Sequence, residues 1–184
     1  AHFELDQIEA ASDLIERAAA RPDASSDILY YLGLLRDRQG RTGEAPLAFL
    51  KTRHLDGLLP RPPWSPSHER FEKIVQSALR DLPPELAKRL EGNLIMVSDL
   101  PGLEVVAEGV DPRTPLLLDE MATTAGGEEQ RRLFVYQRNI ERLIRHPLGL
   151  QEDVREILNR ELEAHFNRPK DESGGTKFSP NRQG

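Results

Sequence analysis

The chain has 184 residues, of which 38% are hydrophobic and 30% are charged, proportions typical of a globular protein. Cysteine is absent and the formal net charge is −6; the first excludes disulfides and thiolate metal sites, and the second argues against a nucleic-acid-binding protein, which needs a basic surface. No run of about 18 apolar residues predicts a membrane span and no signal-peptide pattern is visible, so we expect a cytoplasmic protein.

Residues 4–56 are predicted to form three helices. In the first, Ile8, Leu14 and Ile15 recur at helical spacing. A polar break at residues 21–26 precedes the second helix, for which Asp27 is the expected N-cap. Glycines between residues 40 and 43 end this helix, and residues 44–54 are expected to form the third.

The second and third of these helices carry the spacing of a tetratricopeptide repeat. The positions that carry it are Leu29, Leu32, Gly33, Gly40, Ala45, Phe49 and Leu55. A shift of about 34 residues, the period of this repeat, places Ala11 opposite Ala45 and Ile15 opposite Phe49. The segment therefore resembles one complete repeat preceded by the second helix of another. It is either a peptide-docking groove or a helical pad, meaning a set of helices that packs on the next domain. We favour the pad because a stable groove needs about three repeats.

Residues 57–69 read as a stiff linker. Four prolines lie within them, at positions 60, 62, 63 and 66, and proline-rich segments are extended and semi-rigid. The linker also contains Trp64, the one tryptophan of the sequence. We expect Trp64 to pin the linker to a neighbouring surface; the alternative is an anchor for a binding partner.

Residues 70–167 are predicted to form an α+β domain, and residues 168–184 a polar tail. Amphipathic spacing predicts helices over residues 71–82 and 151–166, with a short helix over 85–91 and a helical turn over 139–145. Apolar runs predict strands over residues 93–98, 116–118 and 133–136, with a loop at Gly126 and Gly127. Helices at the two ends of a short sheet are typical of the α+β class.

Glu161 and His165 lie within the apolar face of the last predicted helix. Projection at about 100° per residue places both among Val154, Leu158 and Leu162. At i,i+4 the two side chains can reach each other, and polar groups inside an apolar face need a partner. Three roles are open at this point: a buried hydrogen-bonded pair, two metal ligands, or an acid–base couple with shifted pKa values.

Residues 71–166 resemble the minimal zincin-like metallopeptidase family of bacteria, which has the motif His-Glu-x-x-His followed by His-Phe-Gly. The matching segments are FEKIV at residues 71–75, LPPEL at 82–86, NLIMV at 93–97, LLL at 116–118, LFVYQRNIERL at 133–143 and VREIL at 154–158. The sequence at the motif itself is Arg160-Glu161-Leu162-Glu163-Ala164-His165-Phe166-Asn167. The order and spacing of the segments carry the resemblance more than any single one does.

The resemblance implies that both zinc ligands have been replaced. Arg160 stands at the first ligand position and Ala164 at the second; a guanidinium does not coordinate zinc and a methyl group has no donor atom. Glu161 keeps the position of the glutamate that polarises a zinc-bound water in the family, and His165 matches the extra histidine, which is not a ligand there. We therefore expect no catalytic residue, no metal and no cofactor.

The function expected from this sequence is that of a catalytically inactive, metallopeptidase-like protein. Such a protein would act as a regulatory or adaptor module that binds a protein or peptide partner, with no nucleic acid and no membrane span. The alternative is a peptidase or other hydrolase with an altered site built from Glu161 and His165. An enzyme needs these two side chains open to solvent, whereas a binding module can block them, for example behind Arg160.

Overall fold

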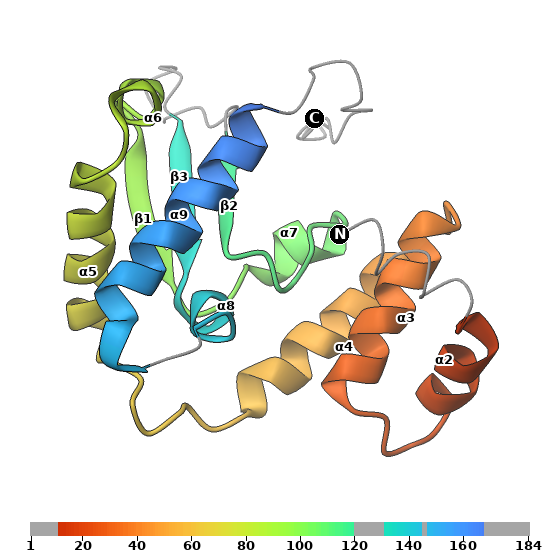
Figure 1. The fold of residues 1–184 in the computed structure, drawn as a ribbon. Helices are drawn as coiled ribbons and strands as arrows, with labels where there is room; N and C mark the ends of the chain where they lie inside the picture. Colours follow the sequence, from red (N-terminus) through yellow and green to blue (C-terminus); the bar gives the residue numbers. More distant parts are fainter. Residues whose placement is uncertain (1–10, 120–130, 145–146, 168–184) are drawn as a thin grey trace, which may run out of the picture. The chain divides into compact units, whose positions relative to one another are not determined.

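The structure is a computed structural model that describes residues 11–119, 131–144 and 147–167 (Figure 1). Its contacts divide the chain into two compact units: Ala1–Arg61 with Leu100–Thr114, and Pro62–Asp99 with Pro115–Gly184. The sequence placed residues 100–114 in the second domain, whereas their contacts place them in the first unit. The predicted polar tail and the loop at Gly126 and Gly127 lie outside the described residues.

The first unit is helical, with α2 (Ser12–Ala19), α3 (Ser26–Arg38), α4 (Ala45–Leu58) and α7 (Leu103–Ala107). The three predicted helices are confirmed where they are described, although α4 runs past the expected end at residue 54. Helix α7 was not predicted. The N-cap of α3 is Ser25, whose Oγ accepts a hydrogen bond from the amide of Ile28 at 3.4 Å. The expectation that Asp27 caps this helix was therefore wrong.

Helices α3 and α4 approach closely at Gly33. A Cβ atom at this position would lie 2.3 Å from the Cδ1 and Cε1 atoms of Phe49, so the ring occupies the space that a side chain would need. Phe49 and Ala45 are buried, and Val106 of α7 packs with them. Gly33 therefore allows the two helices to approach closely, and Ala45 and Phe49 of α4 pack with a segment that comes much later in the chain.

The second unit combines a three-stranded sheet with helices. The helical elements are α5 (His68–Arg80), α6 (Pro84–Arg89), α8 (Gln137–Glu141), the 3-10 turn η1 (Pro147–Gly149) and α9 (Leu150–Phe166). Helix α5 begins before the predicted residue 71 because Ser67 caps it, accepting a hydrogen bond from the amide of Arg70 at 3.4 Å. Helix α8 likewise begins before residue 139, directly after the strand that precedes it.

The sheet contains all three predicted strands, β1 (Leu94–Ser98), β2 (Leu116–Asp119) and β3 (Arg132–Tyr136). Strand β3 lies in the centre, parallel to β1 and antiparallel to β2. The register aligns Met96 of β1 with Phe134 of β3, and Phe134 with Leu117 of β2. The mixed α+β class expected from the sequence is thus confirmed.

One face of the sheet packs against α5 and α9 to form the core of the second unit. Successive side chains of a strand point to opposite faces, so alternate strand residues enter this core. The buried members are Leu116, Leu118, Leu133 and Val135 from the sheet, Phe71, Val75 and Ala78 from α5, and Val154, Ile157, Leu158 and Leu162 from α9. Figure 1 shows α9 running across the sheet, with its C-terminal end at the same end of the sheet as α6.

Candidate functional site

Helix α9 carries the motif positions, and its C-terminal end is fixed by α6. The buried side of α9 consists of the apolar residues that the sequence assigned to it. At the end of the helix, Arg89 of α6 donates a hydrogen bond from Nη1 to the backbone carbonyl of Phe166 at 3.3 Å. The Arg89 guanidinium also lies 5.0 Å from the centre of the Phe166 ring, within the range of a cation–π contact. The last turn of α9, which carries His165, is therefore held by two contacts from α6.

Arg160 and Glu161 form an ion pair on the accessible side of α9. Arg160 Nε donates to Glu161 Oε1 at 3.0 Å, and Arg160 Nη2 donates to the same oxygen at 2.8 Å. The Arg160 side chain is 62% exposed and the Glu161 side chain 30% exposed. Ala164, one turn after Arg160, is exposed as well. The two positions at which the zincin motif has histidines thus lie on one solvent-accessible stripe.

The expected buried pair of Glu161 and His165 is not what the structure shows. Glu161 is half-buried and its hydrogen-bonding partner is Arg160. His165 is half-buried and packs edge-to-face on Phe166, with 5.3 Å between the ring centres. The helical projection placed both side chains within the apolar face, whereas the structure leaves both of them half-buried. The projection could not show that the neighbouring elements cover this side fully at Leu158 and Leu162 but incompletely at Glu161 and His165.

The residues at the motif do not fit a zinc ion. A zinc site in proteins uses imidazole, thiolate or carboxylate donors, and typically at least three of them from the protein. Of the residues at motif positions 160, 161, 164 and 165, only Glu161 and His165 have such a donor, which is fewer than three, and Arg160 already donates to one of the Glu161 oxygens. Across the described residues, no three His, Cys, Asp or Glu side chains gather into a group that could hold a metal ion.

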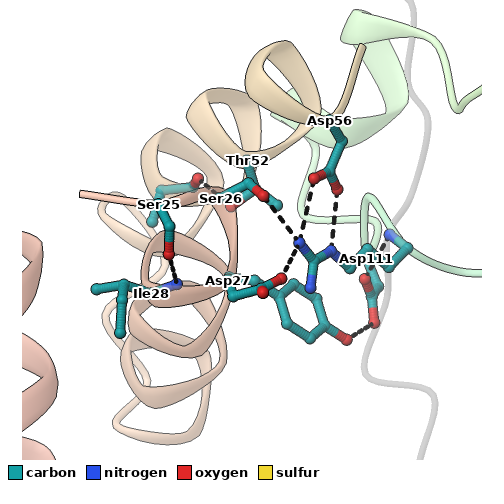
Figure 2. A network of polar contacts seen from close by, with 10 residues as sticks. Ser25, Ser26, Asp27, Ile28, Thr52, Asp56 and Asp111 are labelled. Atoms are coloured by element: carbon teal, nitrogen blue, oxygen red, sulfur yellow. Dashed lines mark hydrogen bonds and ion pairs between the residues drawn. The ribbon is translucent and has the colours of Figure 1, made fainter. Parts of the chain in front are cut away.

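A second polar cluster, which no sequence pattern predicted, lies in the helical unit; Arg113 contacts Asp56 and Asp27 there (Figure 2). Arg113 follows α7 and makes a two-pronged contact with Asp56 of α4: Nε to Oδ2 at 2.9 Å and Nη2 to Oδ1 at 3.1 Å. Nη2 also lies 2.7 Å from Asp27 Oδ1. The guanidinium stacks over the Tyr30 ring at 4.5 Å, and the Tyr30 hydroxyl donates to Asp111 Oδ2 at 2.8 Å.

Burial shifts the pKa of three side chains in this cluster, and at Arg113 its effect is outweighed. Burial lowers the pKa of the Arg113 guanidinium, but the hydrogen bonds and negative charges of Asp56 and Asp27 outweigh it, so the net shift is upward. Burial raises the pKa of the Asp111 carboxyl, although the Arg113 amide and the Tyr30 hydroxyl bond to it. Burial, followed by the charge of Asp111, also raises the pKa of the Tyr30 hydroxyl above its ordinary value.

The Arg113 cluster is suited to holding structure together rather than to chemistry. Buried charges are tolerated when each is paired and hydrogen-bonded, and here Arg113 is held by carboxylates from α3 and α4. Arg113 and Asp56 are 57 residues apart in the sequence, and Tyr30 and Asp111 are 81 residues apart. No local sequence signal reports contacts at such separations, which is why sequence reasoning missed the cluster.

Comparisons with known proteins assign no family to this chain. No protein-family model matches the sequence, and the comparison with curated proteins found no match. Within residues 11–119, 131–144 and 147–167, no helix combines the length and the apolar character needed to cross a membrane. The candidate site therefore rests on its own residues and on the resemblance of their order to the zincin pattern.

Proposed function

We propose that this chain is a catalytically inactive, metallopeptidase-like protein that acts as a regulatory or adaptor module for a protein or peptide partner. The observation that carries the proposal is the contact between Arg160 and Glu161. The cation at the first ligand position donates two hydrogen bonds to the glutamate. In the zincin pattern, that carboxylate must be free to polarise a metal-bound water.

The exposed position of this contact supports a binding role. A blocked carboxylate was the feature expected of a binding module, and an open one that of an enzyme. Arg160 engages Glu161 while most of the Arg160 side chain faces solvent. A surface of this kind presents a guanidinium and an apolar methyl, from Ala164, to an approaching molecule. Guanidinium groups bind carboxylates and carbonyl oxygens of peptides through directional hydrogen bonds.

The outer edge of β1 is the second feature that supports a peptide partner. Among the described residues, β1 pairs with β3 alone, and its side chains Leu94 and Met96 are exposed. An extended peptide can add a strand to such an edge, with backbone hydrogen bonds giving affinity and side-chain contacts giving specificity. We propose that the partner contributes an extended segment with apolar side chains.

For the helical unit we propose a tetratricopeptide-like pad rather than an open groove. The pair α3 and α4 has the close packing at Gly33 that this repeat requires. Val106 of α7 covers Ala45 and Phe49, so the unit supplies its own cover on this side of α4. A groove for a partner would need this apolar surface to remain accessible.

The proposal is tested by selecting random displayed peptides on the full chain and measuring the affinity of the selected sequences. We expect apolar, extended peptides whose affinity falls at least about tenfold for Met96→Lys, because a charge at the edge opposes strand addition. Leu143→Lys is the matched control, since Leu143 is equally exposed in the same unit. Equal binding to both variants, or no enriched peptide, would contradict the proposed mode of binding.

The alternative hydrolase remains open to test because Glu161 is 30% exposed and His165 is half-buried. Both can therefore be reached from solvent. Cleavage of a selected peptide by the wild-type chain, lost in Glu161→Gln and in His165→Gln, would establish this alternative and reject the binding module. Binding without cleavage, including in the presence of added zinc, is the result expected here.

A further inference from the structure

A buried polar cluster ties the linker before α5 to helix α8. Ser65 Oγ donates a hydrogen bond to Glu141 Oε1 at 2.7 Å, and Gln137 Nε2 donates to the same oxygen at 2.8 Å. Gln137 Nε2 also donates to the backbone carbonyl of Pro66 at 3.0 Å. All four residues belong to the second unit, and the proposed binding function uses none of them.

Two acceptor atoms of this cluster have no donor among the described residues. They are Oε2 of Glu141 and Oε1 of Gln137, each with less than 1 Å² exposed. Glu141 is 5% exposed and Gln137 is fully buried. Buried polar atoms without a hydrogen bond are uncommon in folded proteins, and each one calls for a physical explanation.

The charge of Glu141 makes the requirement stronger. Its two donors, the Ser65 hydroxyl and the Gln137 amide, are both neutral. No Lys, Arg or His in the described part of the chain forms an ion pair with it. A buried carboxylate with neither a counter-charge nor a full set of hydrogen bonds is strongly disfavoured.

We propose that Glu141 and Gln137 bind one small monovalent cation. Carboxylate and amide oxygens are ligands for hard cations, and one ion in contact with both would satisfy the two acceptors together. One positive charge also balances the single carboxylate. A divalent ion fits less well, since such sites usually combine more acidic ligands and no group of three metal-binding side chains exists among the described residues.

The ion would stabilise the attachment of the linker. It orients the Gln137 amide with its oxygen toward the cation and its nitrogen toward Glu141 and the Pro66 carbonyl. Because Ser65 bonds to the same carboxylate, the contacts of both linker residues depend on the ion. Cation binding and the position of the chain entering α5 are thereby coupled.

The test is thermal unfolding of the full chain in sodium, potassium and choline chloride at equal ionic strength. Choline is too large for a buried site, so we expect a higher Tm in sodium or potassium than in choline, with a gain that saturates. Glu141→Gln keeps an acceptor for Ser65 and Gln137, removes the charge and should abolish the difference between salts. Glu156→Gln, at an exposed position of α9, is the matched control and should retain it.

Identical Tm values of the wild-type chain in the three salts would overturn the proposal in favour of a bridging water, and so would a salt dependence that survives in Glu141→Gln. If that variant does not fold, sodium NMR of the wild-type chain decides. We expect the sodium signal to broaden, with a broadening that saturates at about one site per chain and is relieved when potassium is added. Broadening that rises linearly with sodium concentration would contradict a specific site.

Discussion

Each of the two units contains an arginine–carboxylate pair with similar contacts, and the two pairs differ in their surroundings. Arg113 binds Asp56, whose side chain is 1% exposed, through two hydrogen bonds. Arg160 also donates two hydrogen bonds, to Glu161, but its own side chain is 62% exposed. The same chemical group therefore fixes a buried structure in one unit and presents a charged surface in the other.

The difference indicates where this chain can change without unfolding. Loss of Asp56 would leave the largely buried Arg113 guanidinium without its buried partner, so the Arg113 cluster is fixed by stability. An exposed pair contributes little to stability, so positions 160 and 161 can vary with function. The loss of zinc ligands that we propose for α9 is thus a change that the fold tolerates.

The largest expected effect comes from breaking the buried pair. Asp56→Ala should lower the free energy of unfolding by about 3–5 kcal/mol, because Arg113 is left without its buried partner. Asp27→Ala removes a carboxylate from the same guanidinium, but Asp27 is 68% exposed, so the cost should be about 0–1 kcal/mol. Denaturant unfolding of both variants measures the contrast. Equal losses would mean that burial does not distinguish the two carboxylates.

A second effect concerns alkaline pH. Burial raises the pKa of Tyr30 above the ordinary value of 10.0. The unfolded chain therefore releases this proton first, and stability should fall as the pH rises above about 10. Tyr30→Phe removes the ionising group, so the free energy of unfolding should fall less steeply with pH. The slope should change by the equivalent of up to one proton per chain. Denaturant midpoints at several pH values above 10, with Tyr31→Phe as control, measure the slope; identical slopes for the two variants would show that Tyr30 is not perturbed.

The smallest effect is expected at α9. Arg160→Ala should change the free energy of unfolding by no more than about 1 kcal/mol, because the pair with Glu161 is solvent-exposed. Double-mutant cycles in denaturant should find coupling between positions 160 and 161, and little between Glu161 and His165. The comparison uses Arg160→Ala, Glu161→Gln and His165→Leu, with two double variants that combine Glu161→Gln with each of the other two changes. A coupling of Glu161 to His165 that exceeds its coupling to Arg160 would restore the buried-pair interpretation.

The parts of the fold that follow from local patterns were predicted from the sequence. Helical periodicity indicated α5 and α9, and short apolar runs indicated the three strands. Helix α7 was missed because five residues are too few to show a helical period. The assignment of residues 100–114 to the second domain failed for a related reason: the contacts of Arg113 and Val106 with the helical unit join residues far apart in the chain.

The sequence was enough to predict which chemical groups the candidate site contains, but not which of its side chains contact each other. The identities of Arg160 and Ala164 alone show that the donors of a zinc motif are missing. The helical projection placed Glu161 and His165 on the apolar side of α9. It could not show how far neighbouring elements cover that side, nor that Arg160 turns toward Glu161. Burial of Glu141 and Gln137 was equally invisible, because it depends on linker residues far away in the sequence.

The most direct test of the account is zinc binding by the wild-type chain and by Arg160→His/Ala164→His, which rebuilds the motif around Glu161. After mild dialysis, elemental analysis should find no stoichiometric zinc in the wild type and about one zinc per chain in the double variant. The control places the same histidine pair at Glu69 and Lys73, an exposed pair one turn apart on α5. Tighter binding at positions 160 and 164 than at this control is the predicted result. Stoichiometric zinc in the wild type, or a rebuilt motif no better than the control pair, would contradict a lost metallopeptidase site.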